Sequence, residues 1–180
     1  MDSGKSHNQI ELTIAETKLT GVLLIKPATV FEDFRGSYIE LYNEEIYKST
    51  GILVDFKQDD ISTSKKNVLR GIHGDSKTWK LVSCLFGRFY LVVVDCKKDS
   101  KQFRQWEAFE LSDVNREQVL IPPGFGNGHL VLSERAIFHY KQSTYYDRES
   151  QFTYLWNDPE LNISWPINNP ILSVRDSGGE

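Results

Sequence analysis

KLVSCLF at Lys80–Phe86 and FYLVVVD at Phe89–Asp95 are the two runs of sequence that decide the fold class. Both are rich in β-branched and aromatic residues, which favours strands over helices. The two-residue link, Gly87-Arg88, predicts that they form a hairpin across the core. Four successive apolar residues, from Leu91 to Val94, predict that the second strand is buried on both faces.

Strand signals dominate the rest of the chain, where short apolar or alternating runs recur between Gly, Pro, Asn or Asp residues. One short peripheral helix is expected, with Asn43 as N-cap and an end before Gly51. Irregular structure is expected for Tyr145–Asp158. This pattern suits an all-β, double-sheet jelly roll. The further expected strands are Gly21–Ile25, Gly36–Tyr42, Phe56–Ser62, Trp106–Leu111, Val119–Ile121, Gly128–Leu132 and Ala136–Thr144.

The length of 180 residues predicts one domain, because two domains would each have a cramped core. Residues 1–9 and 177–180 are expected to be flexible ends. The net charge of −4, with cations scattered among acids, argues against a nucleic-acid partner. No apolar run approaches the ~18 residues of a membrane span, so a cytoplasmic protein without a membrane partner is expected. Cys84 and Cys96 lack the C-x-x-C spacing and are expected to be buried, reduced thiols.

The segment Leu69–Asp75, LRGIHGD, is the first candidate for chemistry because it places His73 between glycines and close to Arg70. On a regular strand these two side chains would point to opposite faces, unless a glycine bulge re-aims one of them. Jelly-roll cupins often bind a metal through histidines and an acid. A set of His73, Asp75 and His129 is therefore one possibility, and a metal-free proton-transfer site is the alternative.

A second candidate region follows the turn at Ile121–Phe125. Asn127 and His129 are two residues apart, so on a strand they share a face and could line one wall of a pocket. Tyr140, Tyr145 and Tyr146 come later, in HYKQSTYY. Aromatic residues in strands usually serve packing, but a phenol in a pocket is also a credible general acid.

Blocks of sequence along nearly the whole chain resemble the dTDP-4-dehydrorhamnose 3,5-epimerase family. They occur in the order of that family, from about Leu19 to Asp176. The resemblance implies a cupin-type double-stranded β-helix and a homodimer with a shared active site. It implies a nucleotide-diphosphate 4-keto sugar as substrate, and no cofactor. The blocks are SKKNVLRGIH at 64–73, Gly124-Phe125, LWNDP at 155–159, Trp165-Pro166 and LSVRD at 172–176.

The same resemblance assigns roles to individual residues. It implies that His73 is the base that removes the proton beside the ketone, and that Asp176 orients the His73 imidazole. Tyr140 would be the acid on the opposite face of the sugar, and Lys80 the cation beside the sugar O4. Inversion needs a base and a separate acid on the two faces of the ring, and an enolate needs a nearby positive charge. The expected substrate-binding residues are Arg35 and Glu40, reaching the neighbouring subunit, with Gln58, Arg70, Asp75, Asn127, His129, Tyr146 and Arg175.

Two departures from the usual family pattern bear on which substrate is expected. Gly74-Asp75 follows the histidine, and Asn127 stands where the Gly-Phe-Ala-His-Gly block usually has its histidine. Both resemble the subgroup that acts on GDP-linked 6-deoxy-4-keto-heptoses in surface-polysaccharide pathways such as capsule and lipopolysaccharide synthesis. The competing hypotheses are an epimerase of C3 alone or C5 alone, a metal-dependent cupin enzyme, and a non-catalytic sugar-nucleotide binding protein.

Overall fold

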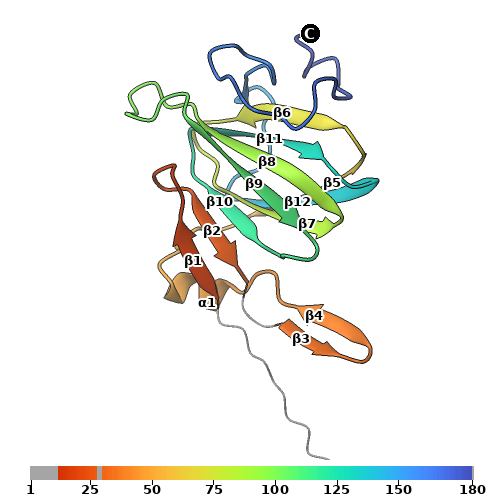
Figure 1. Cartoon of the computed structure of the whole chain (residues 1–180). Coiled ribbons are helices and arrows are strands. Elements are labelled where there is room, and N and C mark those ends of the chain that lie inside the picture. Colours follow the sequence, from red (N-terminus) through yellow and green to blue (C-terminus); the bar gives the residue numbers. More distant parts are fainter. Residues whose placement is uncertain (1–11, 28–29, 180) are drawn as a thin grey trace, which may run out of the picture.

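Two antiparallel sheets face each other in the computed structural model, which describes residues 12–27 and 30–179 (Figure 1). The expected double-sheet jelly roll is confirmed. The first sheet has six strands, in the order β1 (Thr13–Glu16), β2 (Leu23–Lys26), β10 (Gln118–Ile121), β7 (Lys80–Phe86), β12 (Arg135–Gln142) and β5 (Gln58–Lys65). The second has five, in the order β13 (Phe152–Thr153), β6 (Leu69–Gly74), β11 (Phe125–Val131), β8 (Arg88–Asp95) and β9 (Trp106–Ser112).

The main core lies between the two sheets and explains why β8 has such an apolar sequence. Phe89, Leu91 and Val93 on β8 point into this core, against residues of both sheets such as Val82. The alternate residues of β8 pack on the other face, beneath the C-terminal segment that contains Leu161. All four residues from Leu91 to Val94 are 0% exposed, so the prediction of a strand buried on both faces is confirmed.

The hairpin predicted for Lys80–Phe86 and Phe89–Asp95 is wrong. β7 pairs with β10 and β12, whereas β8 pairs with β11 and β9 in the opposite sheet. Gly87 alone links the two strands, and its φ of 75° is favourable for glycine. A Cβ atom at Gly87 would lie 2.2 Å from the carbonyl oxygen of Arg135. The chain therefore crosses from one sheet to the other at Gly87.

The predicted helix is α1 (Glu44–Ser49), and its cap is as expected. The Asn43 side chain accepts hydrogen bonds from the backbone of Glu45 and Ile46, which satisfies free amides of the first turn. The helix does not lie only on the surface, because it contributes a buried side chain to a hydrophobic cluster. Tyr47 is 2% exposed and packs in a second cluster with Ile25, Ile52, Leu81 and Leu120, on the face of the six-stranded sheet that points away from the main core.

Several other boundaries differ from the sequence-based expectations. The strands expected at Gly36–Tyr42 and Ala136–Thr144 end earlier, and β1 and β13 were not expected. Strand β3 (Val30–Asp33) was not expected either, and it pairs with β4 (Gly36–Ile39) in a ribbon that projects away from the two sheets (Figure 1). These strands are short, so their hydrophobic periodicity is weak.

The structure describes the C-terminal end of the chain up to residue 179, but it does not describe residues 1–11. Residues 1–9, expected to be flexible, lie outside the described residues, as does Glu180. Residues 177–179 close a turn in which their backbone amides donate to Ser173, Arg175 and Val174. In the part of the chain that the structure covers, no helix has the length and apolar character that crossing a membrane requires.

Candidate active site

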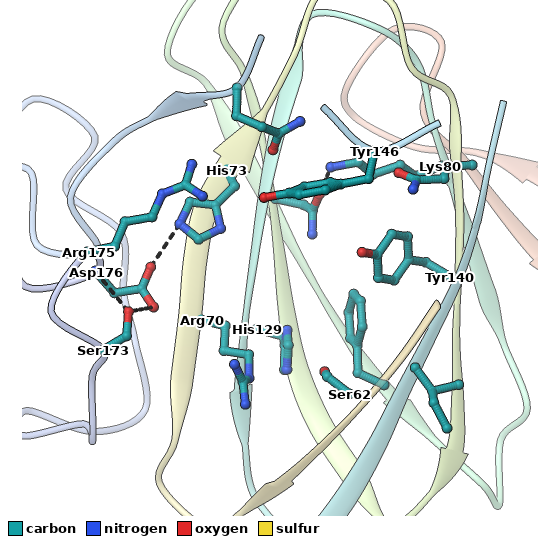
Figure 2. Close-up of a pocket in the computed structure, with 15 residues that line it drawn as sticks. Ser62, Arg70, His73, Lys80, His129, Tyr140, Tyr146, Ser173, Arg175 and Asp176 are labelled. Atoms are coloured by element: carbon teal, nitrogen blue, oxygen red, sulfur yellow. Dashed lines mark hydrogen bonds and ion pairs between the residues drawn. The ribbon is translucent and has the colours of Figure 1, made fainter. Parts of the chain in front are cut away.

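One cavity of about 320 Å³ opens between the two sheets and contains most of the predicted site residues (Figure 2). Its walls come from β5 and β12 of one sheet, β6 and β11 of the other, the start of β7, and the C-terminal segment. The lining residues are Ile61, Ser62, Arg70, His73, Lys80, Asn127, His129, Phe138, Tyr140, Gln142, Tyr146, Gln151, Ser173, Arg175 and Asp176.

A bulge in β6 brings Arg70 and His73 to the same cavity. In the pairing with β11, His73 lies opposite Asn127 and Arg70 lies opposite His129, so one residue of β11 faces two residues of β6. Gly71 permits this irregularity, with a φ of 112° and no room for a side chain: a Cβ there would lie 2.5 Å from the Cα of Gly128. The glycine bulge that the sequence left open is therefore present.

The side chains of His73 and Asp176 are in direct contact at the cavity wall. Nε2 of His73 lies 2.8 Å from Oδ1 of Asp176, whose side chain is only 4% exposed. The carboxylate also accepts hydrogen bonds from the Ser173 hydroxyl and from the backbone amide of Gly71. Burial pushes the pKa of Asp176 upward, but the hydrogen bonds from His73 and Ser173 and the nearby imidazole outweigh it and hold the pKa below its ordinary value. Asp176 is thus an anion that fixes one nitrogen of His73.

Tyr140 lies on the opposite side of the cavity from His73 (Figure 2). It belongs to β12, on which Phe138, Tyr140 and Gln142 all reach the cavity, as the two-residue period of a strand requires. Burial, and next the Asp60 carboxylate, raise the pKa of Tyr140 to about 12. The phenol therefore stays protonated near neutral pH, which is the state that a general acid needs.

Lys80 enters the cavity at the start of β7. Its ammonium donates to Oδ1 of Asn127 at 3.3 Å, so Asn127 holds the cation rather than leaving it to solvent. Burial is the main influence on its pKa and lowers it, Arg175 adds to this effect, and Asp75 partly opposes it. A cation held in this way can stabilise an oxyanion that develops in the cavity.

His129 is a buried, neutral imidazole in the floor of the cavity. It is 3% exposed and stacks on Phe138, with ring centroids 4.1 Å apart. Burial, with Arg70 as the next cause, lowers its pKa to about 3. Its Nε2 has no hydrogen-bond partner within the described residues. This nitrogen is available to a ligand hydroxyl, because a buried polar atom without a partner is costly.

Two more of the expected substrate-binding residues also line the cavity. Arg175 lines the cavity and donates to Oγ1 of Thr153 through Nε and Nη2. Tyr146 also lines it and lies between His73 and Lys80 in the close-up (Figure 2).

Four expected substrate contacts are not part of the cavity wall of this chain. Gln58 lies behind the wall, where its amide donates to Asp60 and accepts from the backbone of Tyr146. Asp75 is buried and is occupied by the backbone amides of Lys77 and Thr78 and by the Gln151 amide. Arg35 sits at the tip of the β3–β4 ribbon and pairs with Asp33, and Glu40 directly follows that ribbon. Gln58 and Asp75 therefore do not line this cavity, whereas Arg35 and Glu40 were expected to reach the neighbouring subunit, so the substrate contacts of all four stay predictions.

The structure also adds cavity residues that the sequence did not indicate. The strand period of β12 could have indicated Phe138 and Gln142, once Tyr140 was taken as facing the pocket. Nothing local could have indicated the residues contributed by irregular segments. The additional residues are Ile61, Ser62, Phe138, Gln142, Gln151 and Ser173.

The possible metal set of His73, Asp75 and His129 does not come together. Within residues 12–27 and 30–179, no three His, Cys, Asp or Glu side chains are grouped so that they could hold a metal ion. The carboxylate of Asp75 is directed to its own turn and to Gln151, as described above.

Cys84 and Cys96 are free thiols, buried and half-buried, and burial raises the pKa of each to about 12.

An imidazole with its carboxylate, a phenol on the opposite side of the cavity and an ammonium in the same cavity are groups suited to acid–base chemistry on a cupin-like jelly roll. The sequence matches the family described as dTDP-4-dehydrorhamnose 3,5-epimerase over residues 16–180. The chain belongs to this family, and it is an epimerase of the isomerase class.

Individual relatives agree with this assignment. The dTDP-4-dehydrorhamnose 3,5-epimerase of Salmonella typhimurium is 42% identical over 171 residues, covering 92% of this chain and 93% of the relative. A Legionella pneumophila dTDP-6-deoxy-D-glucose-3,5-epimerase, solved with dTDP-4-keto-L-rhamnose, has a TM-score of 0.88 at 38% identity, covering 93% of this chain and 91% of that one. A dTDP-4-dehydrorhamnose 3-epimerase of Streptomyces niveus is 34% identical, covering 80% of this chain and 72% of the relative. The family resemblance is therefore confirmed, whereas the GDP-heptose subgroup stays a prediction.

Proposed function

We propose that this chain inverts C3 and C5 of a nucleotide-diphosphate-linked 4-keto-6-deoxy sugar, through an enolate and without a metal. The observation that carries the proposal is the position of His73 and Tyr140 on opposite walls of one cavity. Inversion at carbon requires a proton to leave from one face of the ring and another to arrive at the other face. Two groups on a single wall could not do this.

The reaction follows from the three groups that surround the sugar ring. His73, held by Asp176, removes the proton from a carbon beside the C4 ketone. Electron density moves onto O4, where the Lys80 ammonium stabilises the negative charge. Tyr140 then donates its proton to the opposite face of the same carbon, and the ketone re-forms. The same cycle at the second carbon completes the double inversion.

Two guanidinium groups at the cavity are suited to the nucleotide end of the substrate. Arg70 donates to Ser64 at 3.0 Å through Nε, and Arg175 is held by Thr153. Arginine presents several donors in a fixed plane and binds diphosphate oxygens well. In the floor, the free Nε2 of His129 is a further contact for a sugar hydroxyl.

The nucleotide itself is best tested directly. The three relatives described above all carry dTDP in their names, which makes dTDP-linked 4-keto-6-deoxyhexose the first substrate to try. Gly74-Asp75 and Asn127 are the features that favour a GDP-linked heptose instead. Turnover of dTDP-, GDP- and CDP-linked 4-keto sugars, measured side by side, distinguishes these substrates.

Inversion of C3 alone is the second candidate. It is favoured by the Streptomyces niveus relative, whose name specifies a 3-epimerase. Both reactions use the same base and acid, and they differ in whether the ring can turn to present C5.

Proton NMR in deuterium oxide tests the proposal and separates these candidates. Exchange of both H3 and H5 for deuterium is expected, and exchange of H3 alone would indicate the single inversion. His73→Asn and Tyr140→Phe are each expected to lower kcat by ~10²-fold or more, since general acid–base groups contribute on that scale, while nucleotide binding persists. Exchange at neither carbon with any of the three nucleotides, or full turnover that depends on stoichiometric metal, would contradict the proposed function.

We further propose that the site is shared within a homodimer in the cytoplasm, in a pathway of surface-polysaccharide synthesis. The β3–β4 ribbon carries Phe34 and Tyr38, which are 98% and 66% exposed. Aromatic side chains on a projecting ribbon are typical of an interface with a partner. Arg35 lies at the tip of this ribbon, so a second copy could receive it. The two free cysteines fit a reducing compartment.

A further inference from the structure

Asp60, which the reaction as written above does not use, lies beside the proposed acid. It sits on β5 directly opposite Tyr140 on β12 in the antiparallel pairing. Cross-strand neighbours on one face of a sheet are close enough for their side chains to interact. The Asp60 carboxylate is therefore placed next to the Tyr140 phenol, and after burial it is the main cause that raises the pKa of that phenol.

Two amides fix the carboxylate in place. Nε2 of Gln58 donates to Oδ2 of Asp60 at 2.8 Å, and Nε2 of Gln142 donates to the same oxygen at 3.0 Å. Gln142 itself lines the cavity. With one oxygen held by both amides, Asp60 cannot turn away freely from the phenol. This arrangement joins the edge strand β5 to the cavity wall through side chains as well as through the backbone ladder.

We propose that Asp60 is the positioning residue for the acid: it receives the hydroxyl of Tyr140 and keeps that hydroxyl protonated at the cavity wall until the sugar carbon takes the proton. The inference rests on the proposed function, because it gives Tyr140 the role of acid. Asp60 itself does not contact the reacting carbon in this scheme.

The proton balance explains why an acid would have an anion beside it. When the enolate carbon takes the proton, the Tyr140 O–H bond breaks, a C–H bond forms, and a phenolate is left next to the Asp60 carboxylate. Repulsion between the two anions favours return of a proton from water to the phenolate. His73, which holds the proton removed from the substrate, releases it to solvent, so the enzyme is reset without a net change.

Other titratable groups also lie near Tyr140. The experiment must therefore distinguish the effect of Asp60 on the Tyr140 pKa from the effects of these groups. Burial is the largest cause that raises the pKa of Tyr140, and the neighbouring Asp60 and then Tyr146 raise it further. The remaining titratable groups that line the cavity are Lys80 from β7, His73 and Arg70 from β6, His129 from β11, and Arg175 and Asp176 from the C-terminal segment.

Asp60→Asn removes the charge at constant size, and Asp59→Asn is its matched control. Asp59 is the neighbouring residue on β5 and points to the other face, where it contacts Lys141 and His139. Tyrosinate absorbance is recorded against pH without substrate, and the difference between the wild type and Tyr140→Phe isolates the titration of Tyr140. The Asp60→Asn chain is compared in the same way with Asp60→Asn/Tyr140→Phe.

Asp60→Asn is expected to lower the pH at which Tyr140 titrates by roughly one unit or more, whereas Asp59→Asn leaves it unchanged. The alkaline limb of the kcat profile should move in the same direction, because the acid loses its proton at a lower pH. Equal Tyr140 titrations in the Asp60→Asn and wild-type chains overturn the proposal. If Asp60→Asn does not fold, the wild type still decides: a Tyr140 that titrates at the ordinary tyrosine pKa of ~10 overturns it too. Since these titrations need no substrate, they can fail or succeed independently of the epimerase assignment.

Discussion

The pair formed by His73 and Asp176 shows how one residue prepares another for chemistry. Asp176 is nearly buried, and three donors converge on its two oxygens: the His73 imidazole, the Ser173 hydroxyl and the Gly71 amide. Such an anion fixes which nitrogen of the imidazole carries the proton and leaves the other free to act. The motif around His73 was recognisable in the sequence, whereas its contact with Asp176 joins residues far apart in the chain and was implied only by the family resemblance.

His129 leads to a prediction about stability and pH. Its pKa is about 3 in the folded state, against ~6.5 for an unperturbed histidine. Between these values the unfolded chain binds a proton that the folded chain does not, so stability falls as the pH falls through this window, by at most ~1.4 kcal/mol per pH unit. His129→Phe should remove this loss.

Urea unfolding of the wild type and His129→Phe at several pH values between about 3 and 6.5 measures the effect. The gap between the two free energies of unfolding should change in favour of the variant as the pH falls. A constant gap across the window would show that His129 is not buried in the neutral form. His139→Phe is a useful comparison, because His139 lies near Asp59 on the outer face and its pKa is lowered less strongly.

At the scale of elements, the bulge in β6 decides whether the site exists. Gly71→Ala places a Cβ 2.5 Å from the Cα of Gly128 and keeps a φ of 112° that side chains rarely adopt. We expect a loss of about 2 kcal/mol or more of stability and a large fall in kcat, since Arg70 and His73 would no longer share the cavity. Gly36→Ala is the matched control, with a φ of 120° and nothing within 4 Å of its Cβ. Equal effects of the two variants on kcat would contradict a special role for the bulge.

Strand β8 is the element on which most of the core depends. Leu91 is 0% exposed and belongs to the cluster between the sheets. Leu91→Ala should therefore lower the free energy of unfolding by about 2–5 kcal/mol. Leu53→Ala, at a residue that is 75% exposed, should change it by less than about 0.5 kcal/mol. Chemical denaturation of both variants gives the comparison, and a small loss at Leu91 would mean that the sheets pack loosely there.

For the whole molecule, the decisive question is whether two copies build each site. An Arg35→Ala chain and a His73→Asn chain are each expected to be poorly active. In a mixed dimer, the chain with an intact His73 can receive Arg35 from the other copy, so one complete site forms. Random mixing should then restore roughly a quarter of wild-type activity. No restoration after verified subunit exchange would show that Arg35 does not act across the interface, and sedimentation of the wild type as a monomer would exclude the dimer.

Local sequence determined the elements whose patterns are strong. The buried run at Leu91–Val94, the capped helix after Asn43 and the family blocks around His73 all depend on neighbouring residues, so they could be predicted correctly. The hairpin predicted at Gly87 was wrong because a short link is compatible with pairing in one sheet or with crossing to the other. That choice depends on which distant strands fit better.

Only the tertiary structure decided which side chains share the cavity. Asp75 was expected to be a site residue because it closely follows His73. In the structure its carboxylate instead accepts a hydrogen bond from the backbone amide of Thr78 in its own turn. Nothing in the local sequence singled out Asp60, yet pairing with β12 places it opposite Tyr140. The physical reason is the same in both cases: sequence fixes periodicity and local caps, whereas register, bulges and contacts between distant segments depend on the packing of the whole chain.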